Sequence, residues 1–246
     1  MFPVLQIGSL SIQSSGLIIL AGIWLALTLS ERVAPQLKMD QEVISNLIFY
    51  SLIAALLGAR LSYAFRFPAA FIEHPASLIS FNPGLLDPWG AALAALLVAL
   101  IYGQRRKLNL WKTLDALTPA FAMLVLALAL SQMASGVAYG LPTDLPWAID
   151  LWGASRHPTQ IYLTLTAALI LYLLVICLLP LKQAPGRLFL AFLALTAFSR
   201  VFLDAFRGDP APLLLGLRAS QVLAWLLLAL SLALLSSAQD KNPQKP

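Results

Sequence analysis

The stretch RLFLAFLALTAFSRVFLDAFRGDP, residues 187–210, is largely apolar after its first residue and then carries Arg200, Asp204 and Arg207 at spacings of four and three residues. A helix needs about 20 apolar residues to cross a bilayer, so a span over residues 187–206 is predicted, with Arg200 and Asp204 in its last third and Arg207 directly after its end. At roughly 100° per residue they lie at about 0°, 40° and −20°, on one narrow stripe. Charged groups within a membrane normally face the protein interior and pair with one another. The stripe therefore predicts a buried polar site.

Further apolar runs occur throughout the 246 residues, of which 60% are hydrophobic and only 11% charged. Their approximate limits are 12–30, 44–64, 89–103, 114–132, 160–180 and 213–236, and the run at 89–103 is the shortest. This composition predicts an all-α polytopic membrane protein with about seven transmembrane helices. We expect a single transmembrane domain over residues 1–238 and a disordered tail over 239–246.

Lysine and arginine are distributed unequally between the two sides of the predicted membrane. Ten of the 16, including every lysine, fall in one set of alternate loops, and only Arg66, Arg156, Arg207 and Arg218 fall in the other. Because cytoplasmic loops retain the positive excess, the N-terminus is predicted outside and the C-terminus in the cytoplasm. The net charge of +5 is then a topology signal, and nucleic acid is not an expected partner.

Other polar side chains are predicted at the same depth as the charged stripe. Arg60 and Tyr63 lie three residues apart near the outer end of the second span, and His157 and Gln160 begin the fifth. Together these residues suggest a pocket for an anion, and the abundant anion at the outer leaflet is a lipid phosphate.

Structural explanations for the same residues remain open. Arg60 and Asp204 could form an ion pair that joins two helices, and Arg207 could extend to the interface. His157, beside a proline at a helix start, could serve only as a local hydrogen-bonding group. Cys177 is the only cysteine, so neither a disulfide within the chain nor a zinc cluster of thiolates is possible, and no metal or cofactor is predicted.

Five segments resemble, in order, motifs of the prolipoprotein diacylglyceryl transferase family. The segments are GARLSYAF (58–65), EHPASLI (73–79), GLPTDLPWAID (140–150), RHPTQIY (156–162) and FSRVFLDAFRGDP (198–210). The chain departs from the family where a Gly-Arg-x-x-Asn-Phe-x-Asn-x-Glu segment is expected. It reads LALSQMASGVAYG there, with Ser131 and Gln132 near the position of the arginine. Trp89 also replaces a family histidine, and Leu163 a glutamate.

The resemblance implies transfer of a diacylglyceryl group from phosphatidylglycerol to the lipobox cysteine thiol of a lipoprotein precursor. It implies a bacterial inner-membrane protein with no cofactor, whose site faces the outer leaflet. Its partners would be phosphatidylglycerol or another anionic phospholipid, a lipobox-containing prolipoprotein and the membrane. The residues carried over as catalytic are His157, Arg200 and Asp204, and those carried over as headgroup-binding are Arg60, Arg207, Gln160 and Tyr63.

Two other functions stay open because part of the expected catalytic set is missing. One is a non-catalytic relative that binds anionic lipid or a lipoprotein precursor. The other is a small transporter or flippase, which would also explain charges within spans.

Overall fold

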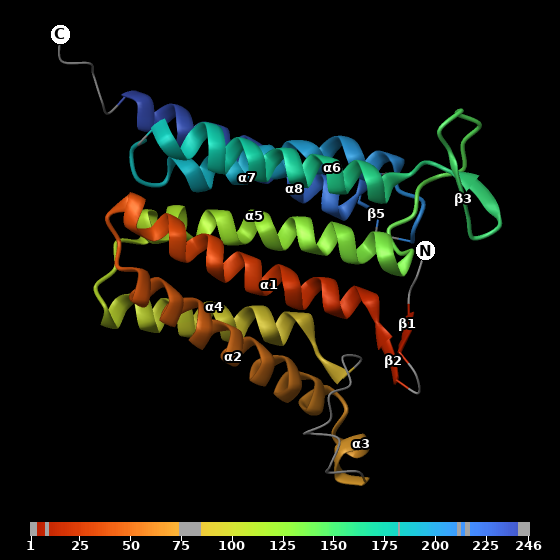
Figure 1. Cartoon of the computed structure of the whole chain (residues 1–246), viewed down its shortest axis with the longest axis horizontal. Coiled ribbons are helices and arrows are strands. Elements are labelled where there is room, and N and C mark those ends of the chain that lie inside the picture. The colour runs from red at the N-terminus through yellow and green to blue at the C-terminus, as the bar shows by residue number, and fades with distance from the viewer. Residues whose placement is uncertain are drawn as a thin grey trace. The chain divides into compact units, whose positions relative to one another are not determined.

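The computed structural model describes residues 4–7, 10–73, 85–181, 183–210, 213–214 and 217–240, most of which are helical (Figure 1). The α-helices are α1 (Ser14–Val33), α2 (Gln41–Arg66), α3 (Pro68–Glu73), α4 (Pro88–Arg105), α5 (Leu110–Ser135), α6 (Thr159–Tyr172), α7 (Arg187–Leu203) and α8 (Ala219–Asp240). Short helical pieces extend three of them: η1 (Ala34–Leu37) follows α1, η4 (Leu173–Leu178, a π-helix) and η5 (Leu179–Leu181) follow α6, and η6 (Asp204–Phe206) follows α7.

Antiparallel hairpins lie at the ends of the helices. The strand pairs are β1 (Val4–Ile7) with β2 (Leu10–Gln13), β3 (Ile149–Leu151) with β4 (Ala154–Arg156), and β5 (Leu213–Leu214) with β6 (Leu217–Arg218). Each pair is an isolated two-stranded ribbon. The strands therefore form no layer of their own, and the fold is built from helices.

Six helices among the described residues are long and apolar enough to cross a membrane. They span Ser14–Leu37, Gln41–Arg66, Leu110–Ser135, Thr159–Leu181, Arg187–Phe206 and Ala219–Ser237. The prediction of an all-α polytopic membrane protein is confirmed. The predicted third span forms α4, which at 18 residues is only about 27 Å long and ends in the polar residues Gln104 and Arg105.

The last helix begins later than the apolar run predicts. Residues 213–236 read as one span, but Leu213–Leu214 pair with Leu217–Arg218 as a hairpin, and α8 starts only at Ala219. The Arg218 side chain is bonded to the segment that follows α7, and this bonding fixes the start of α8. At the other end α8 reaches Asp240, and residues 241–246 lie outside the described residues, so the disordered tail stays a prediction.

The chain divides into two compact units, and each is described by itself. Unit 1 comprises Met1–Val33 and Leu114–Pro246, and unit 2 comprises Ala34–Thr113, so the boundary falls near the start of α5. The expectation of one domain over 1–238 stays a prediction.

Unit 1 contains α1, most of α5, and α6, α7 and α8 (Figure 1). Small residues allow close approach: Gly22 of α1 faces Ala127 of α5, and Ala197 and Val201 of α7 pack against Ala224 of α8. The carboxylate of Asp115 on α5 accepts the backbone N–H groups of Gly186 and Phe189 at 2.6 and 2.9 Å. This cap supplied by another helix ties the start of α7 to α5.

Unit 2 is dominated by the contact between α2 and α4. Gly58 and Gly90 face each other so closely that a Cβ on either would clash with the backbone of the other. Asp87 caps α4, accepts a hydrogen bond from the Ser62 hydroxyl and pairs with Arg66 at 3.6 Å. The Ser62 hydrogen bond is the main reason that the pKa of Asp87 lies below its ordinary value. The two helices are therefore joined tightly at this end.

Candidate functional site at the end of α7

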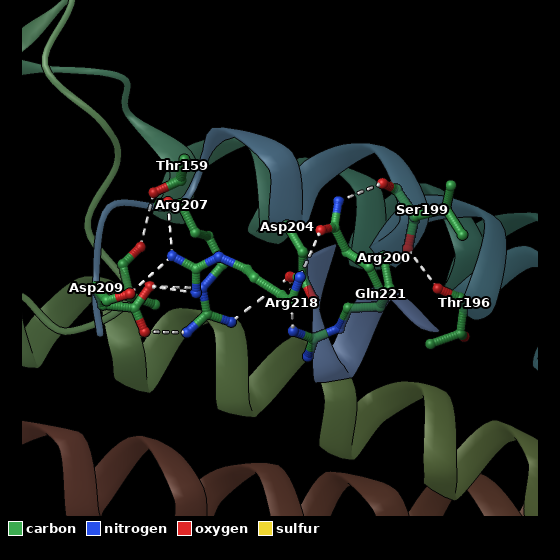
Figure 2. Close-up of polar contacts among 11 residues, drawn as sticks. Thr159, Thr196, Ser199, Arg200, Asp204, Arg207, Asp209, Arg218 and Gln221 are labelled. Atoms are coloured by element: carbon green, nitrogen blue, oxygen red, sulfur yellow. Dashed lines mark hydrogen bonds and ion pairs between the residues drawn. The ribbon is translucent and has the colours of Figure 1, made fainter. Parts of the chain in front are cut away.

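The three charged side chains at the end of α7 do meet. Arg200 Nη1 lies 3.5 Å from Asp204 Oδ1, and Arg207 Nη1 lies 3.6 Å from the same oxygen (Figure 2). The helix tightens into the 3-10 turn η6 at Asp204, but the spacing still brings both guanidinium groups to one carboxylate. The shared face predicted by helical periodicity is present.

Asp204 is completely buried, with 0% of its side chain exposed. Neither of its carboxylate oxygens accepts a hydrogen bond within the described part of the chain. A buried carboxylate is costly unless it is paired with positive charge. The two flanking guanidinium groups supply that pairing, so the position of Arg200 and the burial of Asp204 depend on each other.

Arg207 is bound more tightly by a second carboxylate, that of Asp209. Its Nε and Nη2 donate to the two Asp209 oxygens at 2.9 and 2.6 Å, a bidentate arrangement. The hydrogen bond to Asp209 is the largest of the effects that raise the pKa of Arg207. Burial alone would raise the pKa of Asp209, but hydrogen bonding and charge from Arg207, and the charge of Arg218, bring it below its ordinary value.

Arg218 completes the connection between the end of α7 and the start of α8. Its Nη1 donates to Asp209 Oδ1 at 3.3 Å, and its Nη2 donates to the carbonyl oxygens of Arg207 and Asp209, both at 2.7 Å. Gln221 adds a contact from its side-chain amide to the Val201 carbonyl at 3.1 Å. We call Arg207, Asp209 and Arg218 the clasp; Figure 2 shows it beside Asp204.

The charges of this region do not cancel. Three arginines, Arg200, Arg207 and Arg218, face two carboxylates, those of Asp204 and Asp209, which leaves one positive charge in excess. Both clasp arginines pair with Asp209, and their side chains are 16% and 13% exposed. Arg200 shares Asp204 with Arg207 and is 30% exposed. The excess charge is therefore most accessible at Arg200.

Arg200 lines a small cavity of about 20 Å³ between α5, α6 and α7. Its other polar lining residues are Gln132, Thr196 and Ser199. The Thr196 hydroxyl is buried and has no hydrogen-bond partner among the described residues. A cavity of this size can take about one water-sized group, so it suits an oxygen atom that can accept from Arg200 and Thr196.

An apolar groove of about 440 Å³ runs between α6 and α7 and adjoins this cavity. Ile170 and Ser199 line both. The remaining lining residues of the groove are almost all apolar: Thr166, Leu169, Leu173, Leu195, Phe198, Phe202 and Leu203. A polar end beside a guanidinium and an apolar channel of this kind fit an amphipathic molecule.

His157 lies beside the turn that holds Asp204, and Gln160 follows it in the first turn of α6. The His157 ring contacts the Phe206 ring at a centroid distance of 5.2 Å, and its backbone N–H donates to Leu141. Gln160 is 0% exposed and donates to the Val137 carbonyl at 3.2 Å. Nδ1 of His157 and Oε1 of Gln160 are buried with no hydrogen-bond partner in the described chain. Both residues therefore offer an unused polar atom, and the His157 ring lies against η6.

The segment after α5 is packed tightly enough to fix these positions. Gly140 lies against the His157 carbonyl and against Gly208, and a Cβ at either glycine would clash with backbone. Leu141 N–H donates to the Phe206 carbonyl at 2.8 Å, and Gly208 N–H donates to Tyr139 at 2.8 Å. The loop after α5, the start of α6 and the end of α7 thus form one hydrogen-bonded assembly.

Arg60 and Tyr63 lie in unit 2, on α2. Arg60 Nη1 donates to the Leu85 carbonyl at 3.2 Å, and the Tyr63 ring packs on Phe67 and Phe71 at centroid distances of 4.9 and 6.2 Å. Their convergence with Arg200 stays a prediction. Residues 74–79 of the EHPASLI segment lie outside the described residues.

Asp209, Arg218 and Gln221 also belong to the assembly, although the sequence pattern does not predict them. The GDP sequence after Arg207 reads as a loop, and Arg218 counts only as a loop charge for the topology. The one feature of the sequence that could have indicated this ion pair is the position of Asp209, two residues after Arg207. No group of three or more His, Cys, Asp or Glu side chains that could hold a metal ion occurs in the described ranges.

The fold and site define a class: a polytopic α-helical membrane protein with a buried arginine–aspartate cluster that adjoins an apolar groove. Comparison with known proteins gives the family. The model of the prolipoprotein diacylglyceryl transferase family matches residues 3–237, and the chain belongs to that family.

Curated relatives agree with this assignment. A protein of a Nostoc species, named phosphatidylglycerol–prolipoprotein diacylglyceryl transferase, is 28% identical over 251 residues, covering 94% of this chain and 87% of the relative. A protein of Listeria innocua with the same name is 29% identical over 256 residues, covering 97% and 90%. One of Aromatoleum aromaticum is 28% identical over 247 residues, covering 95% and 94%.

Proposed function

We propose that this chain binds phosphatidylglycerol at the end of α7 and transfers its diacylglyceryl group to the lipobox cysteine of a lipoprotein precursor. One observation carries the proposal: Arg200, where the excess positive charge is most accessible, lines a polar cavity that adjoins an apolar groove. The phosphate would lie at Arg200 and an acyl chain in the groove. The names of the relatives supply the acceptor and the reaction.

The chemistry that the arrangement would support is a displacement at a glyceryl carbon. The sulfur of the precursor's cysteine attacks that carbon, a C–S thioether bond forms, and the C–O bond to phosphate breaks. Glycerol phosphate leaves with the bonding electrons. Arg200 would stabilise the charge that grows on the departing phosphate, because a positioned guanidinium in a poorly hydrated site acts strongly on developing charge.

The thiol proton needs an acceptor, and the proposal gives that role to His157. Its Nδ1 has no hydrogen-bond partner in the described chain and its ring lies on Phe206, two residues after Asp204. A thiolate is the reactive nucleophile, so removal of this proton precedes or accompanies attack. Asp204 would hold Arg200 in place, and Gln160 would offer its free oxygen to the peptide or headgroup.

A non-catalytic lipid-binding role is the second candidate, and the cavity lining favours it. Gln132 lies in the cavity beside Arg200, in the region where the family resemblance leads us to expect an arginine. Loss of one preorganised charged donor commonly costs an enzyme about 10²-fold or more in rate. A chain with one guanidinium at the cavity would still bind an anionic headgroup.

A direct transfer assay separates the two functions. Purified protein in phosphatidylglycerol vesicles is incubated with a lipobox peptide, and the peptide mass is followed for a diacylglyceryl adduct. An adduct that disappears in Arg200→Ala but persists in Arg66→Ala supports the transferase. The matched control is suitable because Arg66 is 63% exposed and pairs with Asp87 in unit 2. Lipid binding without an adduct would reject the transferase and leave the binding role.

A further inference from the structure

The loop that joins α5 to α6 presents two exposed tryptophans, Trp147 and Trp152, which are 57% and 66% exposed. Both indole N–H groups are already used within the protein. Trp147 Nε1 donates to the Tyr162 hydroxyl at 2.8 Å, and Trp152 Nε1 donates to the Gly136 carbonyl at 3.0 Å. The exposed parts of both rings are therefore apolar, and they can leave water without breaking a hydrogen bond.

These hydrogen bonds fix the level of the two rings relative to the helices. Gly136 directly follows the last residue of α5, and Tyr162 lies in the first turn of α6. Both tryptophans are thus held where two membrane-crossing helices end, which is the level at which tryptophan concentrates in membrane proteins. Figure 1 shows the β3 hairpin next to these helix ends.

The hairpin turn holds Trp152 in an unfavourable backbone conformation. Trp152 and Gly153 have φ values of 56° and 74°, both in the left-handed region, between the paired residues Leu151 and Ala154. Two-residue turns of this type favour asparagine or glycine, and a bulky side chain there is uncommon. A tryptophan at this position is less favourable for the turn than asparagine or glycine would be. A favourable interaction of its side chain must therefore offset this conformational cost.

Arg156 makes the loop rigid enough to present these rings. Its Nε donates to the Leu151 carbonyl at 3.0 Å, its Nη1 donates to the Gly140 carbonyl at 3.2 Å, and its guanidinium lies over the Tyr139 ring at 4.9 Å. The loop is therefore a folded platform whose exposed apolar groups are held in fixed positions.

We propose that Trp147 and Trp152 seat this loop in the interface of the lipid bilayer, at the boundary between headgroups and acyl chains. Trp147 is bonded to the first turn of α6, and Ile161, Leu165 and Leu169 of this helix are 39%, 64% and 54% exposed, so in a bilayer they would meet lipid directly below the loop. Asp144 and Asp150 are exposed on the same loop, so attraction to anionic lipid does not drive the contact. The attachment is apolar and insensitive to salt.

Tryptophan fluorescence tests the proposal on the full chain in vesicles. The contribution of Trp152 is obtained by subtracting the emission of Trp152→Phe from that of the wild type, and the same is done for Trp147. The vesicles contain phosphatidylcholine brominated either near the ester end or near the methyl end of its acyl chains. We expect both contributions to lose most of their intensity with the first lipid and little with the second, at low and high salt alike.

Trp24 provides the matched control, since it is also 66% exposed but lies in the middle of α1. Its contribution should be lost mainly with lipid brominated near the methyl end. Trp152→Asn guards against a folding defect, because asparagine suits the turn and should keep the hairpin while the lipid-quenched component disappears. Quenching of the Trp147 and Trp152 contributions by aqueous acrylamide but by neither lipid would overturn the proposal. Protection from acrylamide only after a lipobox peptide is added would also overturn it, and would assign the surface to the peptide.

Discussion

Replacing Asp204 by asparagine should destabilise the protein by removing the buried charge that two arginines share. The ion pairs are 3.5 and 3.6 Å long and the carboxylate is 0% exposed. At an effective dielectric constant of about 20, each pair is worth about 5 kcal/mol of Coulomb energy, which desolvation largely offsets. Because neither oxygen accepts a hydrogen bond from the described residues, we expect a net loss of about 2 to 3 kcal/mol in the free energy of unfolding.

For a chain of this size that loss corresponds to a fall in melting temperature of roughly 5 to 10 °C. Thermal unfolding in detergent, followed by intrinsic fluorescence, measures it directly. A double-mutant cycle with Arg200→Met isolates the coupling between the two side chains, which should exceed about 1 kcal/mol because they are in contact. A change within about 0.5 kcal/mol for Asp204→Asn would refute the reasoning, since that is the range of ordinary surface substitutions.

Two further predictions concern the clasp and the groove. The pKa of Asp209 is lowered in the folded state, so its contribution to stability is complete above the unfolded value near 3.9 and is lost as pH falls through the folded value. The wild type should therefore lose stability below about pH 4. Asp209→Asn should be less stable than the wild type at pH 7, and its melting temperature should change less as the pH falls. The same dependence of melting temperature on pH in both proteins would contradict this. In the groove, Leu169→Trp should fill space between α6 and α7 and weaken lipid binding. Leu165→Trp, on the same helix but outside the groove lining, should leave lipid binding unchanged. Equal lipid retention by the two variants would count against an acyl chain in the groove.

The spans and the charged stripe were predictable from the sequence because each depends on local periodicity. Apolar length predicts a crossing helix, and spacings of four and three residues bring Arg200 and Arg207 to Asp204 even though the helix tightens there. The resemblance to the transferase family was confirmed for the same reason, since its motifs are short and local.

The clasp and the pocket were not predictable in this way. Asp209 and Arg218 meet through an extended segment and a hairpin, where no helical period relates one side chain to the next. The cavity at Arg200 and the groove beside it depend on how side chains of three helices fill space, and composition carries no such information. Whether Arg60 reaches this site depends on how the two units are placed relative to each other, so its part in the site stays a prediction.

The most direct test of the central claim is the affinity for phosphatidylglycerol of Arg200→Gln compared with Arg66→Gln, measured on purified protein by lipid titration. Loss of a charge-assisted hydrogen bond to the phosphate, worth about 1.5 to 3 kcal/mol, should raise the Kd for Arg200→Gln at least about tenfold. The Kd of Arg66→Gln should stay near that of the wild type, because its guanidinium is 63% exposed and lies in unit 2. Equal affinities for the two variants would contradict the assignment of the phosphate to Arg200.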